Sequence, residues 1–308
     1  MRKRLQLALC VLLTITSIAC LCGMFYLQSV RKKEVRKAKE QIADLTEPDE
    51  WQQEHDIDWD SYFETGGYFG DYGDETVTYP AKKVKGLRIQ AEYATIHVLQ
   101  SEDVSDVEVF TQIGGSEDAI RCENKEGIVT ITQANLSEED ASDGSYIEVT
   151  LPAGKELEEF FLVQRDGSTS VSLASPVHNL ELHMDEGSFL SESLTGKSFF
   201  ADINTANIYV KQLDYDVESL RIEEGVFRSD EMDVEKTLSV FTKDGSVNAS
   251  LKRPLAAYHV QSQPGNGSIT VGDVTEFDAL KGKKKEPYLS LRTVGGSITL
   301  DTGEEEEE

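Results

Sequence analysis

The feature that most constrains the fold is a spacing that recurs along the chain. Two apolar residues lie two positions apart, and a second such pair begins nine residues after the first, usually with Gly two positions before it. The clearest copy has Leu289, Leu291, Gly296, Ile298 and Leu300. Apolar residues at alternate positions form one face of a β-strand, and Gly supplies the positive φ of a tight turn. The repeated unit is therefore predicted to be strand–turn–strand.

Copies of this unit occupy most of the chain. They begin at Leu87, Ile120, Phe160, Leu180, Phe199, Leu238, Tyr258 and Leu289, and an irregular copy begins at Leu220. The copy at Tyr258 has two extra residues in its turn, and between residues 160 and 258 the copies start 18 to 21 residues apart. Self-similarity at about 20 residues is typical of solenoids, in which each unit buries its apolar face against its neighbours. We predict an all-β, β-helix-like solenoid over residues 80–303; hairpins in a β-sandwich are the alternative.

The N-terminal part indicates a membrane anchor. Residues 5–30 form a run of 26 residues without a charged side chain, and a membrane-spanning helix needs about 20. Basic residues lie before the run, in residues 1–4, and after it, in a predicted juxtamembrane helix at residues 31–43. We predict a single uncleaved transmembrane helix; a lipoprotein lipidated at Cys20 and a cleaved signal peptide are the alternatives.

The two cues for membrane orientation conflict. The basic residues that follow the span would place the repeats in the cytoplasm by the positive-inside rule. A short basic N-terminus before a long apolar run is instead typical of a signal-anchor. The residues alone therefore leave the side of the membrane open.

Charge restricts the partners of the repeat region. The first 42 residues hold 9 of the chain's 30 Lys and Arg residues but only 2 of its 57 Asp and Glu residues, so the remainder is strongly acidic. Binding to nucleic acid is not expected, because the phosphate backbone attracts basic surfaces. Cations, basic peptides and cationic surfaces are more compatible partners. Residues 304–308 form an acidic tail.

An acidic, aromatic segment at residues 44–79 separates the anchor from the repeats. It contains both tryptophans of the chain, Trp51 and Trp59. We expect it to cap the first repeat, because the ends of a solenoid need covering; a strap that binds a partner is the alternative. The triplet Asp56, Asp58 and Asp60 is spaced like part of a calcium loop. The Gly and Glu that an EF-hand requires further along are absent, so no calcium site is predicted.

A basic insertion interrupts the period between the last two copies. It contains Lys281, Lys283, Lys284 and Lys285, and is interpreted as the one basic cluster of the acidic region. Insertions in solenoids lie on loops, often on the binding face. These lysines, together with Trp51 and Trp59, are the candidate partner contacts.

No catalytic, cofactor or metal site is predicted, because the repeats carry no hydrolase, phosphate-loop or metalloprotease motif. His178 and His183 lie close in sequence, but no second cluster completes a metal site. His97 and His259 alternate with core positions and are predicted to point outward. Cys122, outside the apolar run that holds the other three cysteines, is predicted to face the core as a small apolar residue.

Four runs carry a resemblance to a known family: GSITLDTG, NGSITVGD, KDGSVNASL and EGIVTITQ. They resemble the bacterial putative-adhesin domain, a domain of unknown function, over about residues 80–303. The resemblance implies a β-solenoid with no established catalytic residues. Some relatives are membrane-anchored proteins encoded beside envelope-stress systems, which implies an extracytoplasmic domain in a Gram-positive-type cell.

The resulting hypothesis is a membrane-anchored, non-enzymatic binding or scaffolding module of the cell envelope, with another envelope protein as its partner. A carbohydrate-active enzyme on a β-helix is one alternative. A regulator that faces the cytoplasm is the other. The sequence leaves the oligomeric state open.

Overall fold

The computed structural model describes residues 75–113, 118–135, 145–275 and 287–303. They form sixteen strands and two single-turn 3-10 helices. The elements are β1 (Glu75–Tyr79), η1 (Ala81–Lys83), β2 (Gly86–Ser101), β3 (Val107–Gln112), β4 (Asp118–Lys125), β5 (Ile128–Asn135), β6 (Ser145–Pro152), β7 (Leu157–Ser172), β8 (Val177–Met184), β9 (Ser188–Ile203), β10 (Asn207–Ile222), β11 (Val226–Thr242), β12 (Ser246–Leu251), η2 (Leu255–Ala257), β13 (His259–Pro264), β14 (Ser268–Val271), β15 (Tyr288–Thr293) and β16 (Ser297–Thr302). The predicted all-β class is confirmed for this part of the chain.

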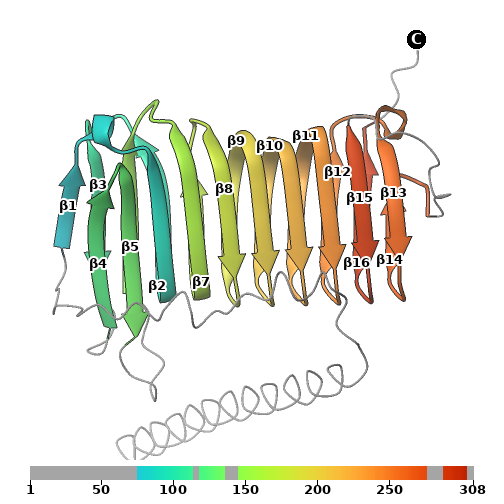
Figure 1. The fold of residues 1–308 in the computed structure, drawn as a ribbon, viewed down its shortest axis with the longest axis horizontal. Coiled ribbons are helices and arrows are strands. Elements are labelled where there is room, and N and C mark those ends of the chain that lie inside the picture. Colours follow the sequence, from blue (N-terminus) through green and yellow to red (C-terminus); the bar gives the residue numbers. More distant parts are fainter. Residues whose placement is uncertain (1–74, 114–117, 136–144, 276–286, 304–308) are drawn as a thin grey trace, which may run out of the picture. The chain divides into compact units, whose positions relative to one another are not determined.

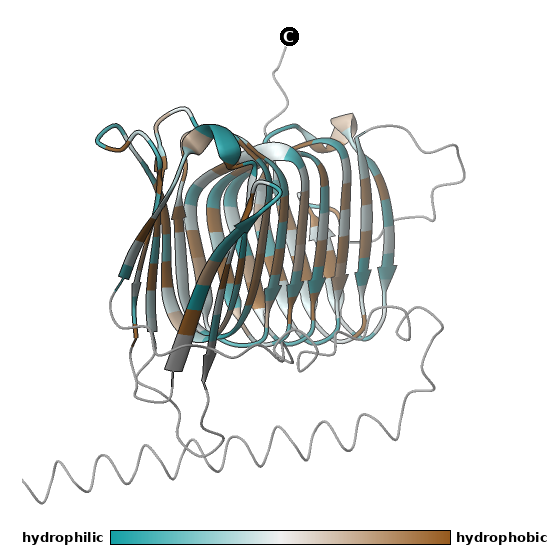
Figure 2. Ribbon diagram, turned by 60° about the vertical axis from the view of Figure 1, so that its left-hand side comes forward, coloured by the Kyte–Doolittle hydropathy of each residue, from teal (hydrophilic) through white to brown (hydrophobic). Residues whose placement is uncertain are grey.

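The strands stack as rungs that bend between two facing sheets (Figure 1, Figure 2). The first half of β10 pairs in parallel with the first halves of β9 and β11, and its second half pairs with their second halves. The second halves of β9, β10 and β11 and the first halves of β2 and β7 belong to sheet A, ordered β4-β5-β2-β7-β8-β9-β10-β11-β15-β13. The other halves of these five strands belong to sheet B, ordered β1-β3-β6-β2-β7-β9-β10-β11-β12-β16-β14. This is the predicted solenoid-like stack.

The core lies between the two sheets because every rung alternates apolar and polar residues. In β10, Ile208 and Val210 are buried, whereas Lys211 is exposed. Equivalent apolar residues of neighbouring rungs are in register, as Leu180 and Phe199 are in sheet A. Figure 2 shows this alternation as bands of brown and teal along the rungs. No rung could bury its apolar side alone, so stacking is required for stability.

Tight turns join the two sheets, and the turns of successive rungs are hydrogen-bonded to one another. The N–H of Thr205 donates to the carbonyl of Asp185 at 2.7 Å. At Gly167 the backbone has a φ of 122°, and a Cβ there would lie 2.1 Å from the carbonyl oxygen of Ala94 in the next rung. Only Gly fits that position. The Gly of the repeat therefore serves both the turn conformation and the close stacking of rungs.

The irregular copy expected at Leu220 is a regular rung, and its first core position lies two residues earlier than the apolar pattern predicts. The residue paired with Phe199 and Leu238 is Glu218, and Leu220 pairs with Ala201 and Val240. Glu218 therefore stands in a core row that holds apolar residues in the other rungs. The expected pair was misplaced by two residues because a charged residue at a core position does not register as apolar.

The two extra turn residues expected in the copy at Tyr258 are also absent. Val260, not Tyr258, pairs with Leu289, and it lies nine residues before Ile269 as the repeat requires. The second core position of this rung is Ser262, which pairs with Leu291. A polar residue in a core row again displaced the expected pair.

The copy at Ile120 is not a stacked rung but an antiparallel hairpin formed by β4 and β5. Its turn contains Glu126 and Gly127 with φ of 55° and 94°, as a type I′ hairpin requires. Cys122, on β4, is half-buried against the core as predicted. Burial raises the pKa of its thiol to about 12, with the nearby Glu75 adding to the shift.

The last repeat in the sequence is not the last rung of the stack. β15 lies between β11 and β13, and β16 lies between β12 and β14. The rung of β13 and β14 is the terminal one (Figure 1). The chain therefore forms the end of the stack and then returns to insert its final rung beside it.

The expected transmembrane helix at residues 5–30, the juxtamembrane helix at 31–43 and nearly all of the segment 44–79 lie outside the described residues. In the described part of the chain, neither helix has the length and apolar character that a membrane crossing requires.

Candidate functional site

The outward face of sheet A carries aromatic and charged side chains in two adjacent register rows that together cross seven neighbouring rungs. We call this group of side chains the outer stripe. It consists of Arg88, Phe161, His183, Phe200, Asp202, Arg221, Phe241 and Arg292. Each of these residues alternates with core residues in its strand, so each side chain points away from the core.

At one end of the outer stripe, rings and one guanidinium stack in sequence. Arg88 lies over the ring of Phe161, with its Cζ 5.1 Å from the ring centroid. The centroid of His183 lies 5.4 Å from that of Phe161 and 5.5 Å from that of Phe200. His183 Nε2 also lies 2.7 Å from Glu181 Oε1. These contacts join three ring faces across β7, β8 and β9, with the Arg88 guanidinium of β2 at their end.

The middle and the other end of the outer stripe combine ion pairs with a second cation–π contact. A nitrogen of Arg221 lies 3.8 Å from Asp202 Oδ2, and another lies 3.7 Å from Glu223 Oε1. Arg292 lies over the ring of Phe241 at 5.6 Å. The outer stripe thus offers both ring faces and guanidinium groups.

Three members of the outer stripe are buried although they point outward. His183 is 4% exposed, and Asp202 and Arg221 are 8% exposed. On the outward face of sheet B, in the same rungs, Leu190 is 52% exposed. Sheets built of parallel strands are normally covered on both faces. Of the outer stripe, Arg88 is exposed and the remaining members are half-buried or buried.

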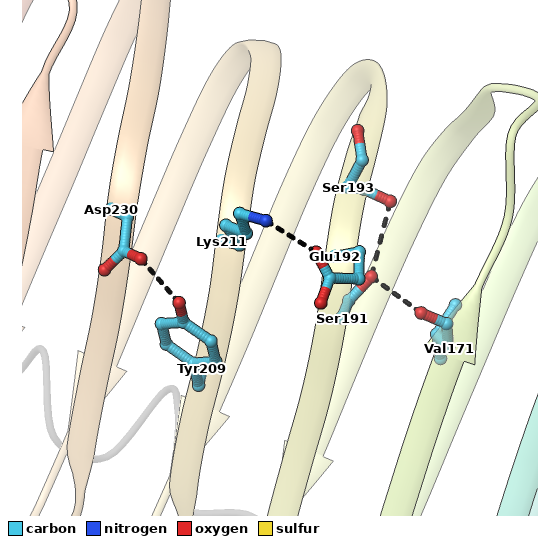
Figure 3. A network of polar contacts seen from close by, with 7 residues as sticks. All are labelled: Val171, Ser191, Glu192, Ser193, Tyr209, Lys211 and Asp230. Atoms are coloured by element: carbon cyan, nitrogen blue, oxygen red, sulfur yellow. Dashed lines mark hydrogen bonds and ion pairs between the residues drawn. The ribbon is translucent and has the colours of Figure 1, made fainter.

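The outward face of sheet B has a different chemistry (Figure 3). Lys211 Nζ lies 3.0 Å from Glu192 Oε2, and the Tyr209 hydroxyl donates to Asp230 Oδ2 at 2.5 Å. The pair with Glu192 raises the pKa of Lys211, and the Tyr209 hydrogen bond lowers the pKa of Asp230. These groups lie at the surface, where such pairs contribute little to stability. The figure also shows the Ser191 hydroxyl donating to the Val171 carbonyl at 2.9 Å.

Two cavities lie elsewhere on the described part of the chain. A cleft of about 500 Å³ at η1 is lined by Lys82, Lys83 and Lys85, so the lysine insertion is not the one basic cluster of the acidic region. A groove of about 440 Å³ is lined by the turns that contain Gly245, Gly267 and Gly296. Those three turns are neighbours because β16 is inserted between β12 and β14.

The side chains of the outer stripe are suited to binding. Among the described residues, no group of three or more His, Cys, Asp or Glu side chains could hold a metal ion. Aromatic faces and guanidinium groups instead contact other aromatic rings and carboxylates. A polypeptide segment rich in aromatic and acidic residues matches this chemistry.

The sequence-predicted partner contacts Trp51, Trp59, Lys281, Lys283, Lys284 and Lys285 lie outside the described residues. Of the histidines, His97 and His259 point outward as predicted; His97 Nδ1 lies 2.9 Å from the Ser170 hydroxyl, and His259 stacks on Tyr288. His178 lies 3.6 Å from Glu156, well apart in its contacts from His183.

The outer stripe was missed by sequence reasoning, although one signal for it exists. In the doublets Phe160–Phe161 and Phe199–Phe200, the first ring enters the core and the second belongs to the outer stripe. A large aromatic residue at a position that should face solvent is such a signal. The core spacing does not reveal these outward aromatic residues, because it concerns only the inward positions.

Residues 105–302 match the family model described as Toastrack DUF4097. A putative adhesin from Parabacteroides distasonis is 18% identical with a TM-score of 0.40, and the alignment covers 76% of this chain and 98% of that one. A putative lipid binding protein from the same organism is 14% identical with a TM-score of 0.44 and the same coverage. A putative adhesin from Bacteroides fragilis is 12% identical with a TM-score of 0.33, over 77% of this chain and all of that one. No curated protein matches the chain.

Proposed function

Because this chain belongs to the Toastrack DUF4097 family, whose function is unknown, we propose that it is a non-enzymatic binding module that holds a polypeptide against the outward face of sheet A. The family match bears out the resemblance found in the short glycine-containing runs. The proposed partner is an extended segment that combines acidic and aromatic residues.

The observation that carries the proposal is the outer stripe itself. Ring faces and guanidinium groups on the outward side of seven rungs are an unusual feature for a solvent-facing surface, and His183 and Arg221 are buried although they point outward. Extended aromatic surfaces with arginine are enriched in protein–protein interfaces. The same rungs carry ordinary charged pairs on sheet B, so the feature belongs to one face and not to the fold in general.

We further propose that the module is held at the cell membrane by the uncharged run at residues 5–30, with the repeats on the extracytoplasmic side. The length of that run supports the anchor. In this setting the module would scaffold another envelope protein. Protease treatment of intact cells tests the side: loss of the domain before lysis is expected, and survival until lysis would contradict the placement.

Binding is tested with the full chain in its own cells, using a photo-reactive amino acid at Ser239 on the outward face of sheet A. The matched position is Asn248, which is exposed on the outward face of sheet B in the same rung. We expect a covalent adduct from Ser239 and none from Asn248. The double variant Phe241→Ala, Arg292→Ala should lose the adduct at Ser239.

A matched control removes the corresponding pair from the other face. Arg228 lies over Tyr209 at 5.7 Å, nearly the geometry of Arg292 over Phe241. The variant Tyr209→Ala, Arg228→Ala should retain the adduct at Ser239. Equal adducts from both faces, or loss of the adduct in both double variants, would contradict a binding role for the outward face of sheet A.

A further inference from the structure

We propose that the cleft at η1 binds a phosphate ester through Lys82, Lys83 and Lys85. This site goes beyond the proposed function, because none of the residues that line the cleft belongs to the outer stripe. Three observations carry the proposal: these lysines have no carboxylate partners, the backbone that carries them is fixed, and they line a cleft of about 500 Å³. Clefts of this size are typical of sites for small molecules.

The three lysines of the cleft differ from most other described lysines because they make no ion pair. Those that pair with a carboxylate are Lys125, Lys211, Lys236, Lys243 and Lys252. Lys82, Lys83 and Lys85 are exposed, and none of them has a carboxylate within ion-pair distance among the described residues. In a chain with a net charge of −27, three unpaired ammonium groups at one place create a local positive field that attracts anions.

The backbone that carries these lysines is fixed by contacts on both sides. Val84, which lies among them in the sequence, is 1% exposed and packs in the core. The N–H of Ala81 donates to Asp106 Oδ1 at 3.0 Å, and the N–H of Lys85 donates to the carbonyl of Gly127 at 2.7 Å. The cleft is therefore formed in advance between η1 and the turn that joins β4 to β5, and a ligand would have little backbone to order.

The type of basic residue favours phosphate over carboxylate as the anion. Guanidinium groups match a planar carboxylate through two parallel hydrogen bonds, whereas ammonium groups act as compact point charges that suit phosphate. The described lining of the cleft contains three lysines and no arginine. A long polyanion would meet the acidic remainder of the domain, so the ligand that fits is a single phosphate group that reaches only the cleft.

The rest of the lining indicates the organic part of the ligand. Tyr79 and Pro80 offer apolar surface, and Asn124 and Glu126 offer polar groups. The Glu126 carboxylate repels a bare phosphate but accepts hydrogen bonds from hydroxyl groups. An ester of phosphate with a polyol, such as glycerol phosphate, meets both requirements. Soluble polyol phosphates and the headgroup of phosphatidylglycerol share this chemistry.

Binding is measured by calorimetric titration of glycerol phosphate into the full chain in an uncharged detergent. We expect saturable binding that becomes at least tenfold weaker in Lys82→Gln, Lys83→Gln, Lys85→Gln, because three charged contacts are lost. The control variant removes the same charge from paired lysines and should retain the affinity: Lys211→Gln, Lys236→Gln, Lys252→Gln. Equal weakening in both variants, or no binding by the unchanged chain, would overturn the proposal.

Protection of the lysines from acetylation supplies a second readout that needs no substitution. The full chain in phosphatidylcholine nanodiscs is treated with an acetylating reagent, and the acetylation of each lysine is followed by mass spectrometry. Glycerol phosphate should slow acetylation of Lys82, Lys83 and Lys85 several-fold. Lys197, an exposed lysine outside the cleft, should react at an unchanged rate. Equal slowing at Lys197, or no slowing at the cleft, would contradict the site.

Nanodiscs that contain phosphatidylglycerol distinguish the two sources of the phosphate ester. If the ligand is a lipid headgroup, these nanodiscs protect the lysines of the cleft without added glycerol phosphate. If the ligand is soluble, only added glycerol phosphate protects them. Either result supports the site and identifies its source. None of these measurements involves the outer stripe, so their failure would leave the proposed function standing.

Discussion

At the scale of the residue, Glu218 is an ionisable side chain that lies among apolar core residues. It is fully buried in a core row between Phe199 and Leu238. Neither carboxylate oxygen has a hydrogen-bond partner among the described residues. Burial raises the pKa of Glu218 well above its usual 4.5, and the nearby Asp214 and Asp233 add to the rise. The buried carboxyl therefore opposes folding rather than supporting it.

Replacing this carboxyl is expected to stabilise the domain. We expect Glu218→Leu to increase the free energy of unfolding at pH 7 by about 2 kcal/mol, because an unpartnered buried polar group costs roughly 1–3 kcal/mol. The comparison uses chemical denaturation of the full chain. Glu235→Leu, at an exposed position, serves as the control and should change stability little. A less stable Glu218→Leu variant would show that the carboxyl has a stabilising partner.

The stability cost of the buried Glu218 carboxyl changes with pH in a defined direction. Because the folded state raises the pKa, the unfolded state releases the proton first, and the domain loses stability as pH rises above the usual 4.5 of the carboxyl. Below that pH both states are protonated and this cost disappears. The stability advantage of Glu218→Gln should therefore grow between pH 4.5 and 7, and a constant advantage would contradict the shift.

At the scale of the element, the stack shows that order in the sequence and order in space can differ. β15 and β16 follow β13 and β14 in the chain but lie between them and the preceding rung. Both orders bury the same core rows, since Val247, Ile298 and Ile269 fall in register either way. The apolar pattern therefore cannot distinguish them. The pairing of strands in the folded chain distinguishes the two orders.

Disulfide formation tests the inserted rung directly. Thr299 pairs with Asn248 on one side and with Thr270 on the other. In a chain whose own cysteines are replaced by Ala, Cys pairs at 248 and 299, and at 299 and 270, should oxidise. A Cys pair at 248 and 270 should not, because two strand spacings, roughly 9.6 Å, exceed the span of about 7 Å that a disulfide bridges. Thiol titration gives the readout. Oxidation of the 248 and 270 pair alone would indicate a stack in sequence order.

At the scale of the whole molecule, the sequence predicts the scaffold well and the surface poorly. The nine-residue spacing specifies two core-facing strands and a turn, which is local information, and the stack follows because such units must cover one another. The hairpin of β4 and β5 uses the same spacing with different pairing, so the pattern could not separate it from a rung. The outer stripe depends on outward positions, which the core pattern leaves unconstrained.

The central claim is that the outward face of sheet A is a recognition surface, and solvent labelling measures this most directly. Hydroxyl radicals would be applied to the full chain in its own cells and to the purified full chain, with oxidation read at Phe200 and Phe241. Tyr209, on sheet B, serves as the internal reference. We predict that oxidation of both phenylalanines is several-fold higher in the purified chain, which lacks the partner, while that of Tyr209 stays constant. Equal phenylalanine oxidation in the two samples would contradict the claim.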